Sequence, residues 1–316
     1  MGNYIIKQLN NTLESVDLNI SPDHYHGKVR ENYYKDEEII MVTSDRVSAF
    51  DHVLGTIPFK GQILNEIACF WFDKTKDIVP NHFISSPDPQ VLVTKKAKTL
   101  PVEVIVRKYI TGSLWREYTQ GINGQYGFML PDNLVENQKF DKPILTPSTK
   151  AEYGLHDEPI SRDEIINSLV DEKIYKKAEE YALQLFDLGQ KWANEMGLIL
   201  VDTKYEFGMY NDELIVIDEI HTPDSSRYWV KDEYEKRFSN NESQKMLDKE
   251  NIRQWLIDKG FQGEGTPPKL TDDIRILLAS KYIELYKILL GKDFVPQIGN
   301  VSNRIKNNLS KYEIIY

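Results

Sequence analysis

The segment 198–218 indicates two strands joined by a polar turn, and each strand carries an acid, Glu206 on the first and Asp218 on the second. If the turn is centred on Asp212, the two carboxylates lie directly opposite each other, with Cβ atoms about 5 Å apart. Such a pair is destabilising alone, but Mg²⁺ takes carboxylates together with nucleotide phosphates as ligands. A solvated hairpin edge with Lys204 as counter-ion explains the same spacing, and a one-residue shift in register would put the acids on opposite faces.

Two further segments combine an arginine with small hydroxyl residues, which are groups that suit a phosphate monoester. Arg227 follows two serines, and Arg107 ends an apolar run that leads into a turn containing Ser113. Lys28 and Arg30 place two more cations at alternate positions near the N-terminus. Each pattern also fits an ordinary surface arginine or a charged strand end, so each is unspecific by itself.

A polar loop at residues 147–158 holds Lys150, His156 and Asp157. Loops of this length and polarity are more often functional than simple connections. The sequence lacks the H-E-x-x-H, Walker A, G-x-S-x-G and dinucleotide-binding fingerprints. Zincin, P-loop, serine-hydrolase and dinucleotide-binding functions therefore have no motif support.

The elements that must position these residues include both strands and helices. Strands are expected in a hairpin at residues 26–43 and at 102–110, and helices at 62–72, 172–196 and 272–290. Ser161 and Glu164 have the spacing of a capping box before a shorter helix. Because helices and strands do not alternate regularly, the pattern predicts an α+β fold and not a doubly wound sheet.

Composition narrows the function classes. The 316 residues are 41% hydrophobic, enough for a large core, and the formal net charge of −10 argues against general nucleic-acid binding. A single cysteine, Cys69, excludes a disulfide scaffold and a cysteine-rich zinc site. The N-terminus lacks a secretory pattern and no window approaches 18 apolar residues, so we expect a cytoplasmic protein without a membrane partner.

Seven segments, taken together and in this order, resemble the phosphoribosylaminoimidazole-succinocarboxamide synthase (SAICAR synthetase) family of purine synthesis over most of the chain. They are GKVRENY (27–33), TSDRVSAFD (43–51), KGQILNEIACFWF (60–72), LPVEVIVRKYITGSLWREY (100–118), PILTPSTKAEYGLHDEPIS (143–161), DTKYEFG (202–208) and IDEIHTPDSSRYW (217–229). The resemblance implies a two-lobed α+β fold related to ATP-grasp enzymes and distantly to protein kinases. ATP would lie in the cleft between a β-rich ATP-binding lobe, residues 1–104, and a substrate- and metal-binding lobe, residues 105–316.

The implied reaction joins L-aspartate to the carboxylate of 5-amino-1-(5-phosphoribosyl)imidazole-4-carboxylate, the ribotide substrate, through an acyl phosphate. ATP and Mg²⁺ are the implied cofactors, the implied partners are small molecules, and the implied assembly is a monomer or homodimer. Matched to the family's motifs, Glu206 and Asp218 would bind the metal, and Arg107, Ser113 and Arg227 would bind the ribotide phosphate. Asp202 and Lys204 would act in catalysis beside the metal, and Lys28 would contact the ATP phosphates. Glu103 and Val104 would meet the adenine, and Lys150, His156 and Asp157 would close on the substrates.

Three positions depart from the family pattern. Lys108 stands where the family usually has glycine and would add a cation beside the ribotide site, His221 replaces an apolar residue, and Glu250 replaces glutamine. We expect Lys108 to affect substrate affinity most. Two other functions remain open from the residues: a kinase-like phosphotransferase, which needs no second anion site, and a nucleotide-binding scaffold, which would be expected to lose Glu206, Asp218 or Arg227.

Overall fold

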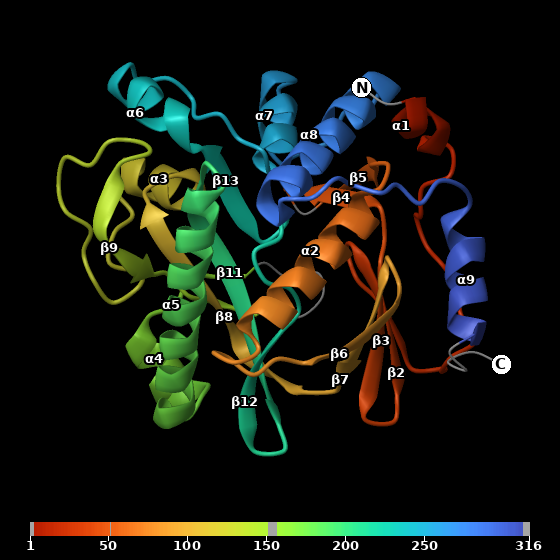
Figure 1. Cartoon of the computed structure of the whole chain (residues 1–316). Coiled ribbons are helices and arrows are strands. Elements are labelled where there is room, and N and C mark those ends of the chain that lie inside the picture. Colours follow the sequence, from red (N-terminus) through yellow and green to blue (C-terminus); the bar gives the residue numbers. More distant parts are fainter. Residues whose placement is uncertain (1–2, 51, 151–156, 312–316) are drawn as a thin grey trace.

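The computed structural model describes residues 3–50, 52–150 and 157–311, and it has the mixed α+β architecture that the sequence predicts (Figure 1). Its helices are α1 (Asn3–Gln8), α2 (Lys60–Thr75), α3 (Gly112–Thr119), α4 (Arg162–Ser168), α5 (Glu172–Glu195), α6 (Lys231–Ser239), α7 (Glu250–Asp258), α8 (Asp272–Leu290) and α9 (Val301–Lys311). Its strands are β1 (His24–His26), β2 (Arg30–Lys35), β3 (Glu38–Thr43), β4 (Arg46–Ala49), β5 (His52–Thr56), β6 (Phe83–Asp88), β7 (Val91–Lys95), β8 (Lys98–Tyr109), β9 (Lys139–Leu145), β10 (Ser148–Thr149), β11 (Leu198–Tyr210), β12 (Glu213–Ile217) and β13 (Ser226–Val230).

The strands of the described residues form two main antiparallel sheets and one small one. The first has the order β1-β2-β3-β7-β6, and β4 pairs with β5 apart from it. The second is built around β8 and β11, which pair with each other; β9 and β10 flank β8, while β12 and β13 flank β11. Helix α5 runs along one face of β8 and β11, which leaves the opposite face of this strand pair for a site (Figure 1).

Helix α5 confirms the predicted amphipathic helix, because apolar residues at spacings of three and four form one buried stripe. The Asp171 carboxylate caps its N-terminus by accepting hydrogen bonds from the backbone N–H groups of Lys173 and Ile174. The predicted capping box is present as well: the Ser161 hydroxyl accepts from the Glu164 backbone, and the Glu164 carboxylate accepts from the Ser161 backbone. Local sequence therefore determines where α4 and α5 each begin.

The β11–β12 hairpin has a different register from the one expected. Asn211 and Asp212 both adopt left-handed backbone angles, with φ of 48° and 62°, and form a two-residue turn. Tyr210 therefore pairs with Glu213, and Glu206 pairs with Ile217 instead of Asp218. The prediction that the two acids lie directly opposite each other is wrong.

The hydrophobic core continues across the boundary expected at residue 104. One large cluster contains residues from both the N-terminal and C-terminal halves, and β8 itself spans the boundary. A second cluster packs Val301, Ile305 and Leu309 of α9 on β2, β3 and β7 of the first sheet. The C-terminal helix therefore covers the N-terminal sheet, and a division into lobes at residue 104 stays a proposal.

A short backbone contact joins the two main sheets near the expected site. Asn81 forms a parallel bridge with Val216 of β12, and the His82 backbone N–H donates to the Val216 carbonyl at 3.2 Å. This contact ties the segment before β6 to the strand that leads directly into Asp218. The position of that acid thus depends on both sheets.

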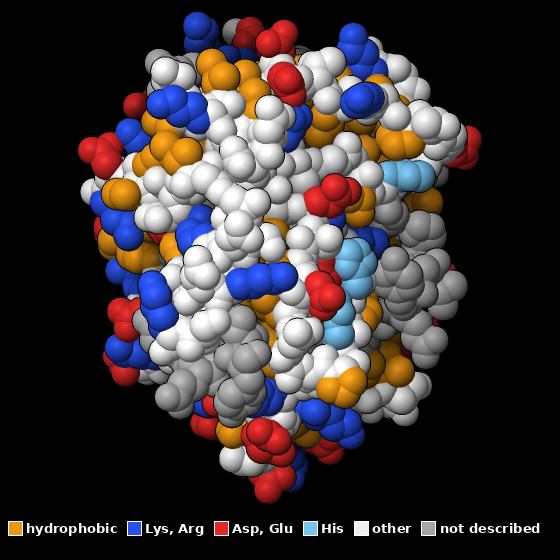
Figure 2. Space-filling view, turned by 90° about the vertical axis from the view of Figure 1, so that its right-hand side faces the viewer, with side chains coloured by type: hydrophobic (Ala, Val, Ile, Leu, Met, Phe, Trp, Pro, Cys, Tyr) orange, Lys and Arg blue, Asp and Glu red, His pale blue; other side chains and the backbone are white. Residues whose placement is uncertain are grey.

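The surface carries charged side chains of both signs, as expected from a sequence with 39 Lys and Arg and 49 Asp and Glu. Figure 2 shows Lys and Arg interspersed with Asp and Glu on the face that it displays, with histidine side chains near its middle. Among the helices of the described ranges, none has the length and apolarity that a bilayer span requires.

Candidate active site

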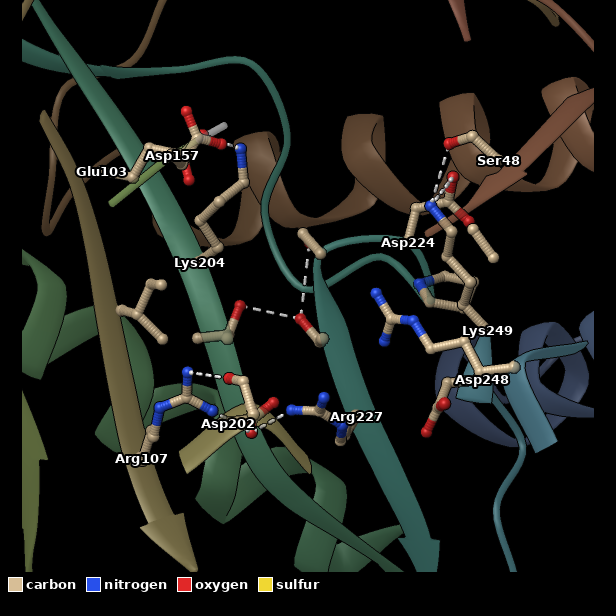
Figure 3. A pocket seen from close by; sticks show the side chains of 18 of the residues that line it. Ser48, Glu103, Arg107, Asp157, Asp202, Lys204, Asp224, Arg227, Asp248 and Lys249 are labelled. Atoms are coloured by element: carbon tan, nitrogen blue, oxygen red, sulfur yellow. Dashed lines mark hydrogen bonds and ion pairs between the residues drawn. The ribbon is translucent and has the colours of Figure 1, made fainter. Parts of the chain in front are cut away.

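A cavity of about 460 Å³, here called the central cavity, lies on the face of β8 and β11 opposite α5 (Figure 3). Glu103, Ile105 and Arg107 of β8 line it from alternate positions, because successive side chains of a strand project to opposite faces, and Asp202, Thr203 and Lys204 of β11 lie beside them. Eight of the residues predicted from the sequence line the cavity: Lys28, Glu103, Arg107, Ser113, Asp157, Asp202, Lys204 and Arg227. The strand pair thus gathers functional groups that lie far apart in the sequence.

At one end of the central cavity, Asp202 lies between two arginines. It pairs in register with Arg107 of β8 on one side and with Arg227 of β13 on the other. The Asp202 carboxylate accepts from the Arg107 guanidinium at 3.1 Å and from the Arg227 guanidinium at 2.5 Å. Ser113 accepts from Arg107 at 3.3 Å. One carboxylate therefore fixes two guanidinium groups next to a hydroxyl; this group of Arg107, Ser113, Asp202 and Arg227 is here called the arginine end.

The backbone of α3 approaches this arginine pair closely. Gly112 has a φ of 61°, and a Cβ atom there would lie 2.3 Å from Nη2 of Arg227. Side chains other than glycine rarely adopt this backbone conformation. The glycine thus makes room for the guanidinium of Arg227 at the start of α3.

At the other end, Lys204 lies between two acids. Glu103 and Glu206 pair in register across β8 and β11, and Nζ of Lys204 contacts their carboxylates at 2.7 and 2.6 Å. Lys150 donates a second, short hydrogen bond to Glu206. Burial alone would raise the pKa of Glu206, but Lys204 and Lys150 hold it below its ordinary value. Burial raises the pKa of Glu103, with Lys204 opposing the shift.

Asp218 reaches the same end from the chain that leaves β12. Its φ of 67° turns it out of the strand direction, and Arg30 of β2 donates to its carboxylate and, at 2.6 Å, to that of Glu219. Burial alone would lower the pKa of Arg30, but Asp218 and Glu219 raise it above its ordinary value. Glu206 and Asp218 both act to raise the pKa values of Lys150 and Lys204, so the two acids belong to one electrostatic cluster despite the altered register. Together with Glu103, these two acids are here called the acidic end.

The donor set at this end suits a hard cation. Glu206 is held in its ionised form, and carboxylate oxygens are the ligands that Mg²⁺ prefers. Among the described residues, no group of three or more His, Cys, Asp and Glu ligands gathers. Mg²⁺ usually binds through one or two carboxylates and completes its shell with phosphates and water, so Glu206 and Asp218 fit that ion better than a metal held by protein groups alone.

The remaining predicted residues have different outcomes. Asp157 lines the cavity close to Glu103, whereas His156 lies outside the described residues (Figure 3). Val104 is fully buried in the core on the other face of β8. Because β8 is paired with β10 and β11 on its two sides around Glu103, this part of the backbone offers no free edge. The adenine contact expected at Glu103 and Val104 stays a prediction.

Sequence reasoning missed a buried group beside the cavity. Lys60, fully buried, contacts Asp224 at 2.8 Å, and Lys249 lies 3.7 Å from the same carboxylate and 3.5 Å from the hydroxyl of Ser48. Burial lowers the pKa of Lys249 to about 8, with Asp224 opposing the shift. No local spacing could have revealed this group, because its members come from four separate segments. The sequence indicated Arg30 as one of two cations at alternate positions, but it did not indicate its partners, Asp218 and Glu219.

The three departures from the family pattern also have structural outcomes. Lys108 points away from the central cavity and donates to the Asp141 carbonyl at 2.7 Å, so the expectation that it adds a cation beside the ribotide site is wrong. Glu250 contacts Arg227 at 3.3 Å and Arg253 at 2.9 Å, and is therefore part of the arginine end. His221 is fully buried, with its Nε2 2.5 Å from the hydroxyl of Tyr205.

Known proteins share both the sequence and the fold. The SAICAR synthetase family model matches residues 23–269. The phosphoribosylaminoimidazole-succinocarboxamide synthase of Bacteroides thetaiotaomicron is 48% identical over 294 residues, covering 91% of this chain and 94% of its own length. That of Flavobacterium psychrophilum is 45% identical, covering 96% of this chain and 98% of its own.

Two solved structures add the three-dimensional comparison. The SAICAR synthase of Saccharomyces cerevisiae in complex with SAICAR has a TM-score of 0.78 and 34% identity, covering 90% of this chain and 99% of the yeast chain. A SAICAR synthetase in complex with ADP has a TM-score of 0.66 and 26% identity, covering 86% and 100%. The chain therefore belongs to the SAICAR synthetase family, the ligases of purine synthesis that use ATP to join L-aspartate to the carboxylate of the carboxylated aminoimidazole ribotide.

Proposed function

We propose that the two ends of the central cavity divide the substrates between them. The ribotide 5′-phosphate binds at the arginine end, to Arg107, Ser113 and Arg227. The phosphates of ATP bind at the acidic end, where Lys28 covers them. The observation that carries this proposal is the row of Asp202, Lys204 and Glu206 at alternate positions of β11, of which the first two line the cavity, with arginines paired beside Asp202 and Glu103 paired beside Glu206.

Glu206 and Asp218 are the residues that would hold Mg²⁺. When bound, the ion would neutralise charge on the phosphates during transfer. In the protein alone, Lys150 and Lys204 neutralise Glu206 and Arg30 neutralises Asp218. The same cations would lie close to the transferred phosphoryl group, because they already contact the acids that would hold the ion bound to it.

The chemistry follows from the weak reactivity of a carboxylate as an acyl donor. An oxygen of the ribotide carboxylate attacks the γ-phosphorus of ATP, the bond to the β-phosphate oxygen breaks, and ADP leaves. The amine of L-aspartate then attacks the acyl carbon, and inorganic phosphate leaves as the amide forms. Both steps depend on alignment and on neutralising charge, which the protein supplies through fixed cations.

Within this scheme, Lys204 is the cation best placed between the two substrates. It lines the cavity midway along the row and is locked by Glu103 and Glu206. Asp202 acts on Arg107 and Arg227, which makes it a positioning residue for the phosphate site. Lys150 and Asp157 border the acidic end and would close on the substrates. We also propose that the chain divides into two lobes at residue 104.

The test is a coupled assay that follows ADP release and formation of the amide product with Mg-ATP and the carboxylated ribotide, with and without L-aspartate. We expect ADP and amide to appear together only with all three substrates. The matched pair of variants is Glu206→Gln at the acidic end and Glu213→Gln at the exposed start of β12. Only the first should lose turnover, by about 10³-fold. ADP release without aspartate, or an active Glu206→Gln enzyme, would contradict the proposal.

A further inference from the structure

Lys28 lies in the short turn of residues 27–29, which joins β1 to β2 and brings this lysine to the wall of the central cavity. The hairpin forms one edge of the first sheet, and the side chains of its three-residue strand β1 are exposed. A hydrogen bond from the Gly27 N–H to the Arg30 carbonyl, at 2.8 Å, closes the turn. Hairpins at a sheet edge open readily unless other elements hold them. The position of Lys28 therefore depends on what supports this turn.

An arginine from a different sheet supports the turn. Arg46 lies on β4, which pairs with β5 and belongs to the small sheet. Its guanidinium donates to the carbonyl of Lys28 at 3.0 Å, to that of Gly27 at 2.8 Å and to that of Arg30 at 3.4 Å. One planar group thus binds three carbonyls of the segment that carries Lys28.

The fourth carbonyl of this segment is bound from the same stretch of chain. The Val29 carbonyl accepts from the N–H of Ser44 at 3.0 Å and from its hydroxyl at 2.7 Å. The carbonyls of residues 27–30 therefore all accept hydrogen bonds from residues 44–46. Because buried backbone groups require partners, these contacts determine how the turn lies against the rest of the fold.

Burial and charge make this arrangement specific to arginine. Arg46 is 3% exposed, and the carboxylate of Glu31, which is 1% exposed, balances its charge at 2.6 Å. An arginine offers five N–H donors in a rigid plane, and Arg46 contacts four carbonyls, including that of Glu14, and one carboxylate. A lysine in its place would keep the charge but could not reach as many acceptors at once.

We propose that Arg46 is a positioning residue for the use of ATP: it holds the turn so that Lys28 meets the ATP phosphates in the central cavity. This inference rests on the proposed function of Lys28. Because Arg46 is buried, it acts through the turn and not by contact with a substrate. A residue that served the fold alone would affect stability without distinguishing ATP from the ribotide, so the two roles give different kinetics.

The test is a double-mutant cycle, measured as initial rates with ATP and the ribotide varied in turn. Arg46→Lys should raise the KM for ATP about tenfold and leave the KM for the ribotide within about twofold, because it loses carbonyl contacts but keeps a charge beside Glu31. In an enzyme that already carries Lys28→Ala, the same change should raise the KM for ATP by less than about twofold, since the group that Arg46 positions is absent.

Arg275→Lys is the matched control. Arg275 of α8, with 15% of its side chain exposed, also donates to backbone carbonyls, those of Thr56 at 2.8 Å and Leu9 at 2.7 Å, which lie outside the turn. Both lysine variants should lower the thermal unfolding midpoint, whereas only Arg46→Lys should change the KM for ATP. Glu31→Gln keeps an acceptor but removes the counter-charge of Arg46, and it should raise the KM for ATP about threefold.

If the effects of Arg46→Lys and Lys28→Ala on the KM for ATP multiply, Arg46 does not act through Lys28 and the inference is wrong. Equal increases in the KM values for ATP and the ribotide would also overturn it, as would an unchanged KM for ATP in folded Arg46→Lys and Glu31→Gln enzymes. Should Arg46→Lys fail to fold, Glu31→Gln is combined with Lys28→Ala in the same cycle. An unchanged KM for ATP in Lys28→Ala would instead contradict the proposed placement of the ATP phosphates, and the role of Arg46 with it.

Discussion

The two ends of the central cavity are built on the same pair of strands but carry opposite excess charge. At the arginine end, Arg107 and Arg227 pair with Asp202, Arg227 and Arg253 pair with Glu250, and Arg116 lines the same cavity. At the acidic end, Arg30, Lys150 and Lys204 face Glu103, Glu206, Asp218 and Glu219. One end therefore has spare positive charge for an anion, and the other has spare negative charge for a cation.

The difference arises from the neighbours of β11 and not from β11 itself. This strand supplies an acid at each end, Asp202 and Glu206, with Lys204 between them. Beside Asp202 the flanking strands provide arginines, whereas beside Glu206 the flanking strand provides Glu103. The charges of β11 are nearly symmetrical, and the strands that pair with it give the two ends of the site opposite excess charge.

Asp218→Asn should cause the largest effect, a loss of about 10³-fold in kcat, because it removes a metal ligand from the acidic end. The fold should survive, since asparagine tolerates the left-handed backbone that Asp218 adopts. Asp212→Asn is the matched control: the same substitution, with a φ of 62°, in the exposed turn of the same hairpin. Near-normal turnover of Asp218→Asn in a steady-state assay would remove this acid from the metal site.

Arg227→Ala should raise the KM for the ribotide by about 100-fold and leave the KM for ATP within about twofold, because it acts on the arginine end alone. Arg237→Ala, a variant of an α6 arginine that pairs with Glu233, should change neither value. Initial-rate kinetics with each substrate varied in turn measure the split. Equal increases in both KM values would show that the two ends do not act separately.

Lys150→Ala should have a smaller effect, about tenfold in kcat/KM for ATP. Its side chain is 38% exposed, and Lys204 still neutralises Glu206 when it is gone. Lys142→Ala, which removes an exposed lysine of β9, serves as the control. A loss as large as that of Asp218→Asn would instead make Lys150 a principal group of the acidic end.

His221→Leu should change nothing at the cavity but should alter how stability depends on pH. Burial lowers the pKa of His221 to about 3 from 6.5, so below pH 6.5 the unfolded chain binds a proton that the native protein does not. Native stability therefore falls as pH falls through this window, by about 1.4 kcal/mol per pH unit for this group. Denaturant unfolding at pH 4.5 to 7.5 should give a shallower slope for the variant; parallel curves would contradict the assignment.

Periodicity predicted the long elements well, because α5 and α8 each bury a face that the spacing of apolar residues already marks. It could not give the hairpin register, since that depends on both Asn211 and Asp212 adopting left-handed angles. It also could not give the contact of Arg30 with Asp218, which joins residues 188 positions apart. Residue type alone suggested a role for Lys108 that its direction on β8 rules out.

Gly112 and Arg227 are separated by 115 positions in the chain, yet they lie so close together that a substitution of one affects the other. A side chain at position 112 would meet the guanidinium and would also have to adopt a left-handed backbone, so we expect a substitution there to weaken the arginine end in the same direction as a substitution of Arg227. A screen of random variants for purine auxotrophy should therefore recover substitutions at both positions, and a methyl group at position 112 should be enough.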